Sequence, residues 1–428
     1  MIAEAKRQSG KAGGIDLGGT VREIAAEVTF ARIKPILPNF GITRLANITG
    51  LDTIGIPVWT VVRPLGRSLS VSQGKGVTHE LAVVSGIMES IEVFHAEQRR
   101  PTPTVRDLFE CNRDPSFISP HRLPIRSDAA ASESAQIEWL RGEDLFGGTE
   151  KWVPAELFDL DFTEQREQPV FLSSSNGLAS GNTRTEAIVH GLCEVIERDQ
   201  VSFWSVEQDV QQNPKRRVIV QSIKDPICRS LVEKCEAAGL DIFIWHITIN
   251  IDVPVFMCTI VDRRNNTPYP QQSTGSGCHP VATIALARAI TEAAQSRVTH
   301  ISGLREDLTW SRYRTEFLSD AENAKIELAR MSSQPETIDL SALSAVCRDV
   351  PVDMQSLLKD ILKRLAQTGL QNAIVVDLAD NDIFSVVFVC VPGLEYKSSK
   401  ARALYTPGSR MRDFISQCDP PHIGLATK

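Results

Sequence analysis

Three times along this chain, a glycine-rich segment runs directly into a helical pattern that carries a pair of oxygen-bearing side chains. The segments span residues 73–76, 173–182 and 275–280. The pairs that follow them are Glu89 with Glu92, Glu194 with Glu197, and Glu292 with Gln295. Residues at positions i and i+3 lie on one face of a helix, so each unit directs both members of its pair the same way. We therefore predict three loop–helix units that gather five glutamates and one glutamine.

The helices around these acids are apolar on most of their faces. Residues 81–88 and 188–196 are mainly aliphatic, and a helix that is apolar nearly all round is usually buried. A single pair of this kind is far more often found on a solvent-facing helix, but that alternative fits these surroundings poorly. Buried carboxylates need compensating charge, and Mg²⁺ prefers oxygen ligands shared with phosphate groups. We therefore expect divalent cations here, and Mn²⁺ would suit the same ligands.

Basic residues accompany the acids. Arg198, Arg288 and Arg297 lie in the same helices, where a guanidinium can hold phosphate with two hydrogen bonds or form a structural salt bridge. The pattern leaves both roles open. Glycine-rich loops before helix N-termini favour bound anions, because backbone N–H groups are unpaired there. The Walker and GxGxxG patterns are both absent, so we exclude P-loop and Rossmann nucleotide sites.

Glu186 and His190 extend the face of the second helix that carries Glu194 and Glu197, because their spacing keeps them within one helical stripe. A histidine on a helix face is more often packed or hydrogen-bonded than catalytic. Cys278 could be a nucleophile, but the sequence shows nothing that would orient it, and a small structural residue is the commoner role. We therefore assign no catalytic residue from the sequence.

Composition sets the class of protein. The chain has 428 residues, of which 42% are hydrophobic and 23% charged, as in soluble globular proteins. Its formal net charge of −7 argues against nucleic acid as a partner. Nine cysteines without a C-x-x-C pair suit reduced thiols, and no apolar run is long enough to cross a membrane. We expect a cytoplasmic protein.

Strand and helix patterns alternate along the chain, which predicts an α/β (α+β) fold with mixed sheets. Helical periodicity covers residues 78–97, 185–204, 225–238, 320–331 and 353–368. Strand patterns cover residues 41–62, 242–260, 372–378 and 384–391. Residues 99–161 are rich in proline, serine and charge, so we expect them to wrap the surface as loops and short strands.

At these motifs the chain resembles the YcaO superfamily, over about residues 41–395. The first stretch that carries the resemblance is Thr43-Arg44-Leu45-Ala46-Asn47-Ile48-Thr49-Gly50-Leu51-Asp52. The most specific one runs from Ser175-Asn176-Gly177 through Glu186 to Glu194-x-x-Glu197-Arg198-Asp199. The others are Ser85-x-x-x-Glu89-x-x-Glu92, Arg288-x-x-x-Glu292-x-x-Gln295-x-Arg297, and Val391-Pro392-Gly393-Leu394-Glu395. The family's first motif usually continues as Glu-Arg, whereas Val93 follows Glu92 here.

The resemblance implies a YcaO-type fold in which the three loop–helix units enclose a site for ATP and Mg²⁺. The residues implied to bind ATP are Ser85, Asn176, Arg198, Arg288 and Gln295. The residues implied to hold Mg²⁺ are Glu89, Glu92, Glu194, Glu197 and Glu292. Glu186, His190 and Arg297 would form a surrounding layer. The implied domains are an N-terminal extension (1–40), a catalytic domain (41–395) with a loop-rich insert at about 99–170, and a C-terminal tail (396–428).

Family members use ATP to phosphorylate the oxygen of a peptide backbone amide, with a precursor peptide or protein as substrate. A side-chain nucleophile then gives an azoline ring, whereas external sulfide gives a thioamide. Azoline-forming members commonly end in a Pro-x-Pro-x-Pro tail, which residues 419–428 lack, so we favour thioamide formation with a TfuA-like partner that delivers sulfur. The resemblance also implies a homodimer.

Three alternatives remain open. The first is an azoline-forming cyclodehydratase. The second is an accessory factor that binds ATP without turnover, as in the subgroup linked to methylthiolation of a small-subunit ribosomal protein. The third sets the resemblance aside and takes the chain as another ATP-dependent ligase or kinase with a three-helix acid cluster.

Overall fold

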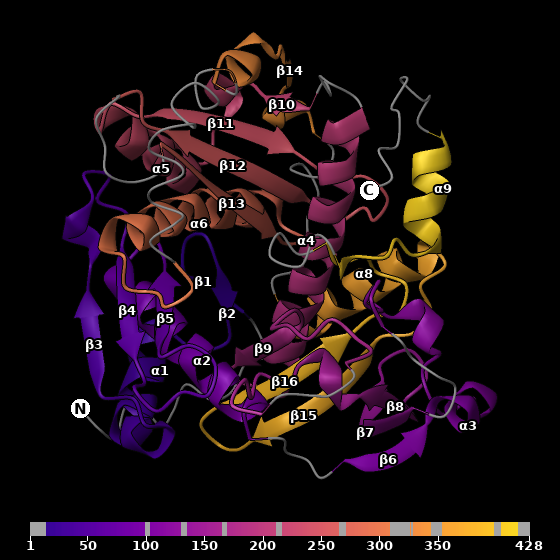
Figure 1. The fold of residues 1–428 in the computed structure, drawn as a ribbon. Helices are drawn as coiled ribbons and strands as arrows, with labels where there is room; N and C mark the ends of the chain where they lie inside the picture. Colours follow the sequence, from indigo (N-terminus) through magenta and orange to yellow (C-terminus); the bar gives the residue numbers. More distant parts are fainter. Residues whose placement is uncertain are drawn as a thin grey trace.

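The computed structural model describes residues 14–98, 103–129, 135–164, 169–210, 216–264, 271–308, 326, 328–343, 353–397 and 404–417. Within these ranges the chain forms four sheets with helices packed between and around them (Figure 1). Among their strand pairs, only β10 and β14 run parallel. The mixed α/β fold predicted from the sequence is confirmed.

The sheets differ in size. The two smallest contain β1 (Ile15–Asp16) with β2 (Val21–Arg22), and β3 (Arg44–Asn47), β4 (Val58–Val62) and β5 (Val71–Lys75). The five-stranded sheet has the order β13 (Gln272–Cys278), β12 (Val255–Val261), β11 (Asp241–His246), β10 (Arg217–Val218) and β14 (Glu336–Ile338). The six-stranded sheet has the order β6 (Thr104–Asp107), β7 (Gln136–Asp144), β15 (Ile374–Asp380), β16 (Ser385–Cys390) and β9 (Leu178–Gly181), with β8 (Thr149–Pro154) on β7.

The α-helices are α1 (Ala26–Ile33), α2 (His79–Ala96), α3 (Leu108–Arg113), α4 (Arg184–Val210), α5 (Pro226–Ala237), α6 (Ala282–Ser302), α8 (Met354–Gln367) and α9 (Ser409–Gln417). Short 3₁₀ helices connect them at Lys34–Phe40, Thr49–Leu51, Pro120–Arg122, Ala155–Leu157, Val220–Ser222 and Leu340–Ala342. Side-chain caps fix several helix starts. Thr78, Asp225 and Asp353 each accept a hydrogen bond from a backbone N–H three residues on. The helices predicted at 78–97, 225–238 and 353–368 are therefore confirmed.

Three strand–helix units form the centre of the molecule. β5 leads into α2, β9 into α4, and β13 into α6, and each helix packs back on the strand that precedes it. In Figure 1, α4 runs between the five-stranded and six-stranded sheets, and the β1–β2 hairpin lies between α6, α2 and α4. The three acid-bearing helices therefore surround one central space.

Part of each glycine-rich segment is a strand rather than the predicted loop, whereas residues 173–177 and 279–280 lie outside the strands. Gly74 lies in β5, Gly181 ends β9, and Gly275 and Gly277 lie in β13. A Cβ atom on Gly74 would lie 2.0 Å from the carbonyl oxygen of Ala82, and the same atom on Gly277 would lie 2.2 Å from that of Ala285. These glycines therefore allow a strand to touch the backbone of the next helix, which the sequence pattern did not reveal.

Residues 99–161 contain strands as predicted, but these strands contribute to the core instead of wrapping the surface. These residues supply β6, β7 and β8 to the six-stranded sheet, and Trp139 in β7 is fully buried. The strands predicted at 372–378 and 384–391 are confirmed as β15 and β16. The helix predicted at 320–331 lies partly outside the described residues, of which Ile326 and residues 328–333 are helical.

Candidate functional site

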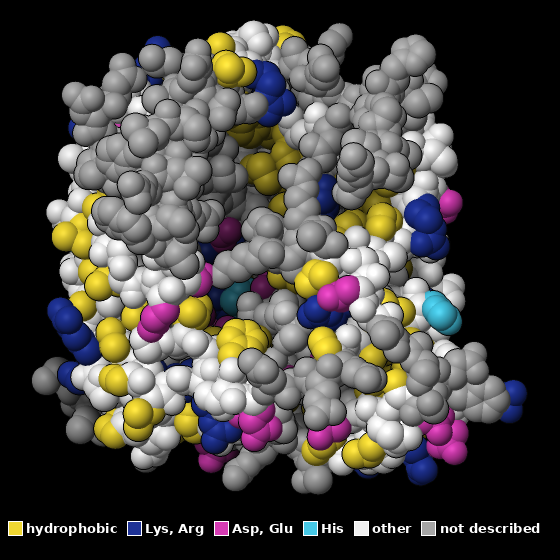
Figure 2. Space-filling model, viewed as in Figure 1, with side chains coloured by type: hydrophobic (Ala, Val, Ile, Leu, Met, Phe, Trp, Pro, Cys, Tyr) yellow, Lys and Arg dark blue, Asp and Glu magenta, His cyan; other side chains and the backbone are white. Residues whose placement is uncertain are grey.

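A cavity of about 760 Å³ lies between α2, α4 and α6. Its volume falls in the usual range of small-molecule sites. Figure 2 shows a hollow on this face of the molecule, with acidic, basic and histidine side chains at its bottom. The cavity brings together most of the predicted site residues: Ser85, Glu89, Glu92, Glu186, His190, Glu194, Glu197, Arg198, Arg288, Glu292 and Gln295.

α2 contributes Glu89 and Glu92, one turn apart. Glu92 accepts a hydrogen bond from the hydroxyl of Ser180 in β9, whereas Glu89 faces the open space of the cavity. Glu89 is open to the cavity, but desolvation there raises its pKa, and burial raises the pKa of Glu92 well above its ordinary value. Both carboxylates therefore have too little positive charge around them, which favours a bound cation.

α4 contributes Glu194, Glu197 and Arg198. Glu197 is buried and accepts a hydrogen bond from Ser276 Oγ at 2.7 Å, and Arg198 Nη1 lies 3.7 Å from Glu197 Oε1. Burial raises the pKa of Glu194 to about 7, despite the opposing effect of Arg198. Burial also acts against the charge of Arg198, but Glu197, Glu292 and Glu194 outweigh it and raise the pKa of that guanidinium.

α6 contributes Glu292, whose charge is compensated by an ion pair with Lys75. Lys75 Nζ lies 2.6 Å from Glu292 Oε2, and the N–H of Ser276 donates to Oε1 at 3.4 Å. Burial alone would raise the pKa of Glu292, but Lys75 and Arg198 lower it to about 2. Lys75 lies within the first glycine-rich segment, 73–76, and was not among the predicted site residues.

Arg288 and His190 form a polar contact across the cavity, with Arg288 Nη2 3.2 Å from His190 Nε2. Burial, then the nearby charges of Arg288 and Arg22, lower the pKa of His190 well below its ordinary value, so the ring is neutral. In the described structure, Arg288 Nε is buried and has no hydrogen-bond partner. An unpaired guanidinium N–H in a cavity wall is suited to an anionic ligand.

Glu186 lines the cavity, but its carboxylate already accepts hydrogen bonds from other residues of the protein. Its carboxylate accepts from the backbone N–H of Glu23 at 2.9 Å, from Asn182 Nδ2 at 3.0 Å, and lies 3.3 Å from Arg22 Nη1. The N-terminal hairpin, which the sequence analysis left outside the site, therefore forms part of the cavity wall. Arg22 and Glu23 lie 164 and 163 residues from Glu186 in sequence, so no local pattern could reveal these contacts.

Two predicted site residues are not brought to the cavity wall. Arg297 is fully buried behind it, where Nε lies 3.1 Å from Asp52 Oδ1 and Nη2 lies 3.0 Å from Asp262 Oδ2. Of its two possible roles, Arg297 therefore has the structural one. Asn176 precedes β9 and does not line the cavity, although Ser173, Ser174 and Ser175 do.

The carboxylate oxygens around the cavity suit an Mg²⁺ ion that is also bound by phosphate oxygens. In the described parts of the chain, no three His, Cys, Asp or Glu side chains are close enough to hold a metal ion by themselves. Mg²⁺ commonly binds through one or two carboxylates together with substrate phosphates and water. Five glutamates spread around one cavity, with Lys75, Arg198 and Arg288 between them, meet that requirement.

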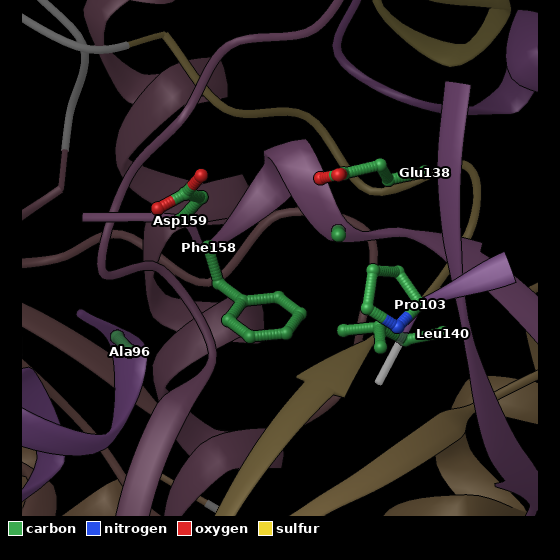
Figure 3. Close-up of a pocket in the computed structure, with 7 residues that line it drawn as sticks. Ala96, Pro103, Glu138, Leu140, Phe158 and Asp159 are labelled. Atoms are coloured by element: carbon green, nitrogen blue, oxygen red, sulfur yellow. The ribbon is translucent and has the colours of Figure 1, made fainter. Parts of the chain in front are cut away.

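A second hollow is too small to bind a substrate. It measures about 10 Å³, room for about one water molecule. The ring of Phe158 lies beside Pro103 and Leu140, with the carboxylates of Asp159 and Glu138 above them (Figure 3).

The cysteines offer no reactive group in the described structure. Cys111, Cys193, Cys228, Cys235, Cys258, Cys278 and Cys390 are all buried and unpaired. Burial raises the pKa of Cys278 well above its ordinary value, which disfavours the thiolate that a nucleophile needs. The described helices include none with the length and apolar character to span a membrane.

Comparison with protein families gives one match that covers most of the chain. Residues 73–395 match the family described as YcaO cyclodehydratase, ATP- and Mg²⁺-binding. A relative from Rhizobium leguminosarum bv. trifolii, an uncharacterized protein in the tfuA 3′ region, is 33% identical over 383 residues. That alignment covers 87% of this chain and 88% of the relative.

Solved structures share the fold. YcaO from Methanopyrus kandleri, bound with AMPPCP and Mg²⁺, superposes with a TM-score of 0.70 at 22% identity, over 91% of this chain and 97% of that one. A heterocyclase in complex with substrate and cofactor superposes with a TM-score of 0.71 at 21% identity and 88% coverage of this chain. The match spans about half of the heterocyclase, or 53% of its length.

Proposed function

Because this chain belongs to the YcaO family, we propose that it uses ATP and Mg²⁺ to phosphorylate the oxygen of a peptide backbone amide. The family description agrees with the predicted cofactors, ATP and Mg²⁺. The observation that carries the proposal is the convergence of six glutamates and three basic side chains, from three strand–helix units, on one cavity. Such a charge arrangement suits phosphoryl transfer, which depends mainly on positioning and charge neutralisation.

The basic side chains have distinct proposed roles. Lys75, Arg198 and Arg288 contact the phosphate groups of ATP, and Arg288 has an unpaired buried Nε available for this purpose. Neutral His190 accepts a hydrogen bond from Arg288 and so fixes the direction of its guanidinium. Ser85 and Gln295 line the same cavity and bind the nucleotide.

The carboxylates from the three helices would hold Mg²⁺: Glu89, Glu92, Glu194, Glu197 and Glu292. When bound, Mg²⁺ supplies neutralisation of the phosphate charge and polarises a phosphoryl oxygen. Ser180 and Ser276 orient the carboxylates of Glu92 and Glu197 by hydrogen bonds. Glu186 keeps the N-terminal hairpin in the wall of the site.

We further propose that the product is a thioamide and that a TfuA-like protein supplies the sulfur. The similarity to a relative encoded in the tfuA 3′ region supports this choice. The second candidate is azoline formation, which the fold shared with a heterocyclase favours. In both reactions the activated oxygen leaves with phosphate, and the nucleophile decides the product.

Mass spectrometry of a candidate precursor peptide tests the proposal. The peptide is incubated with this protein, a TfuA-like protein, ATP, Mg²⁺ and sulfide. Replacement of one oxygen by sulfur would support thioamide formation, and loss of one water without sulfide would support azoline formation. An unmodified peptide with no ADP released would contradict the proposal and favour a non-catalytic accessory factor.

A further inference from the structure

The loop between β4 and β5, residues 63–70, presents a large apolar side chain to solvent. Leu65 is 90% exposed. It lies in a tight turn in which the N–H of Gly66 donates to the carbonyl of Arg63 at 3.0 Å, with Pro64 at the position that favours such a turn. The turn therefore projects Leu65 away from the protein surface.

The base of this loop is held firmly by one buried carboxylate. Arg63 Nη1 and Nη2 donate to Glu97 at 2.6 and 2.8 Å, and both side chains are buried. The N–H and hydroxyl of Ser68 also donate to Glu97, at 3.0 and 2.8 Å. Four hydrogen bonds to one carboxylate fix the loop, so the exposure of Leu65 does not come from a loosely attached segment.

A second exposed apolar residue lies on the segment beside this loop. Phe162 is 61% exposed, and its N–H donates to the carbonyl of Arg67 at 3.2 Å. Arg67 Nη1 also lies 2.6 Å from Asp161 Oδ2, so the two segments are joined by both backbone and side chains. Phe162 and Leu69 both line the central cavity. We call Leu69 and Phe162, together with Leu65 on the same loop as Leu69, the apolar rim; Leu65 itself does not line the cavity.

Resting on the proposed function, we infer that the apolar rim is a docking surface for an extended, apolar stretch of the peptide substrate. Exposed apolar side chains on a rigid support are suited to anchoring a partner, because little conformational entropy is lost on binding. Leu69 and Phe162 line the cavity, and Leu65 lies four residues from Leu69 on the same loop, so a peptide held there would place a neighbouring backbone amide near the acidic residues. Arg67 and Asp161 neutralise each other, which leaves the rim without strong attraction for a charged ligand.

A peptide fits this surface better than a second copy of the chain. The rim consists of a few side chains around a cavity opening, whereas a stable dimer usually buries about 800 Å² on each partner. Peptide recognition, in contrast, often depends on a few anchor side chains. Figure 2 also shows apolar side chains beside the hollow, next to its charged bottom.

A library of random linear peptides, displayed and selected on the full-length protein with Mg²⁺ and AMPPCP, tests the inference. We expect enriched peptides to carry apolar residues. Their dissociation constants should rise about tenfold or more in Leu65→Ser and in Phe162→Ser. The control Val105→Ser removes an exposed side chain on β6 and should bind like the unmodified protein.

Two outcomes would overturn the inference. One is a selection that enriches no peptide, or only peptides that bind the rim variants as tightly as the unmodified protein. The other is a sedimentation experiment in which the same substitutions dissociate a dimer, since the rim would then be a subunit interface. Failure of the proposed function would look different, because the unmodified protein would then release no ADP while its peptide binding still depended on the rim.

Discussion

The ammonium nitrogen of Lys75 lies 2.6 Å from Oε2 of Glu292, and this ion pair joins β5 to α6 across the cavity. The two residues are 217 positions apart in sequence. Together with Arg198, Lys75 lowers the pKa of Glu292 to about 2 against the effect of burial. The charge of Glu292 is thus compensated within the protein, whereas desolvation raises the pKa of Glu89, Glu92 and Glu194.

We expect Lys75→Met to reduce peptide-stimulated ADP release by about tenfold to a hundredfold, because one positive charge near the phosphates is lost. Steady-state kinetics with varied ATP would measure the effect. Lys151→Met, on β8 and outside the cavity lining, is the control and should keep full activity. Normal ADP release from the Lys75 variant would exclude a role for this side chain in the reaction.

We expect Glu194→Gln to weaken Mg²⁺-dependent nucleotide binding by about tenfold or more, because a charged ligand is lost while the side-chain shape is kept. Calorimetry with AMPPCP, with and without Mg²⁺, would measure the binding. Burial disfavours the charged form of Glu194, so the variant should unfold at a temperature no lower than the unmodified protein. Glu110→Gln, on the exposed side of α3, should change neither property. If nucleotide binding depended equally on Mg²⁺ in Glu194→Gln and Glu110→Gln, Glu194 would not be a metal ligand.

We expect Arg297→Met to destabilise the protein by about 3–5 kcal/mol, because it leaves the buried carboxylates of Asp52 and Asp262 without their shared partner. Urea unfolding would measure the free energy. Nucleotide affinity of the folded variant should remain normal, since Arg297 does not line the cavity. A stable variant with weakened ATP binding would instead place Arg297 in the site.

The same ion pair predicts how stability depends on pH. Burial acts to raise the pKa of Asp262, but hydrogen bonds from Arg264 and Arg297 outweigh it and lower the pKa below 3.8. Its contribution to stability is therefore fully present above pH 3.8 and is lost as the pH falls through the folded-state pKa. In Arg297→Met this loss on acidification should be smaller. Unfolding free energies of Arg297→Met and of the unmodified protein, measured at several acidic pH values, would test this. If the two curves were parallel, Asp262 would contribute nothing to the pH dependence.

We expect Gly74→Ala to destabilise the protein by about 2–3 kcal/mol, because the new Cβ would lie 2.0 Å from the carbonyl oxygen of Ala82 and 2.1 Å from the backbone nitrogen of Gly86. Thermal unfolding would measure the change. Gly50→Ala is a matched control, since its Cβ would meet no heavy atom within 4 Å. Similar melting temperatures for the two variants would mean that β5 and α2 can separate easily.

The sequence predicted those elements whose signals are local. Thr78, Asp225 and Asp353 are N-caps that can be recognised from the residues that follow them, and the corresponding helices are confirmed. The acid pairs also needed only helical spacing and apolar surroundings. The structure indeed brings all five glutamates to the wall of one cavity.

Contacts between distant segments could not be predicted. The glycines of β5 and β13 gave a loop-like pattern, because single-sequence periodicity does not show that a helix lies against the strand. Lys75 and Arg22 were missed as site residues because their partners, Glu292 and Glu186, are far along the chain. Arg297 has the same sequence context as a phosphate-binding arginine, and only the positions of Asp52 and Asp262 show its structural role.

The contact between strand glycines and helix backbone has a consequence for protein engineering. Because backbone meets backbone in β5–α2 and β13–α6, the positions of the acid-bearing helices are set without intervening side chains. Replacing the glycines of these strands with larger residues would push the helices away and so shift the acidic residues themselves. Redesign of substrate preference should therefore leave the three strand–helix units untouched and vary the exposed loops around the cavity opening, where side chains can change without displacing a helix.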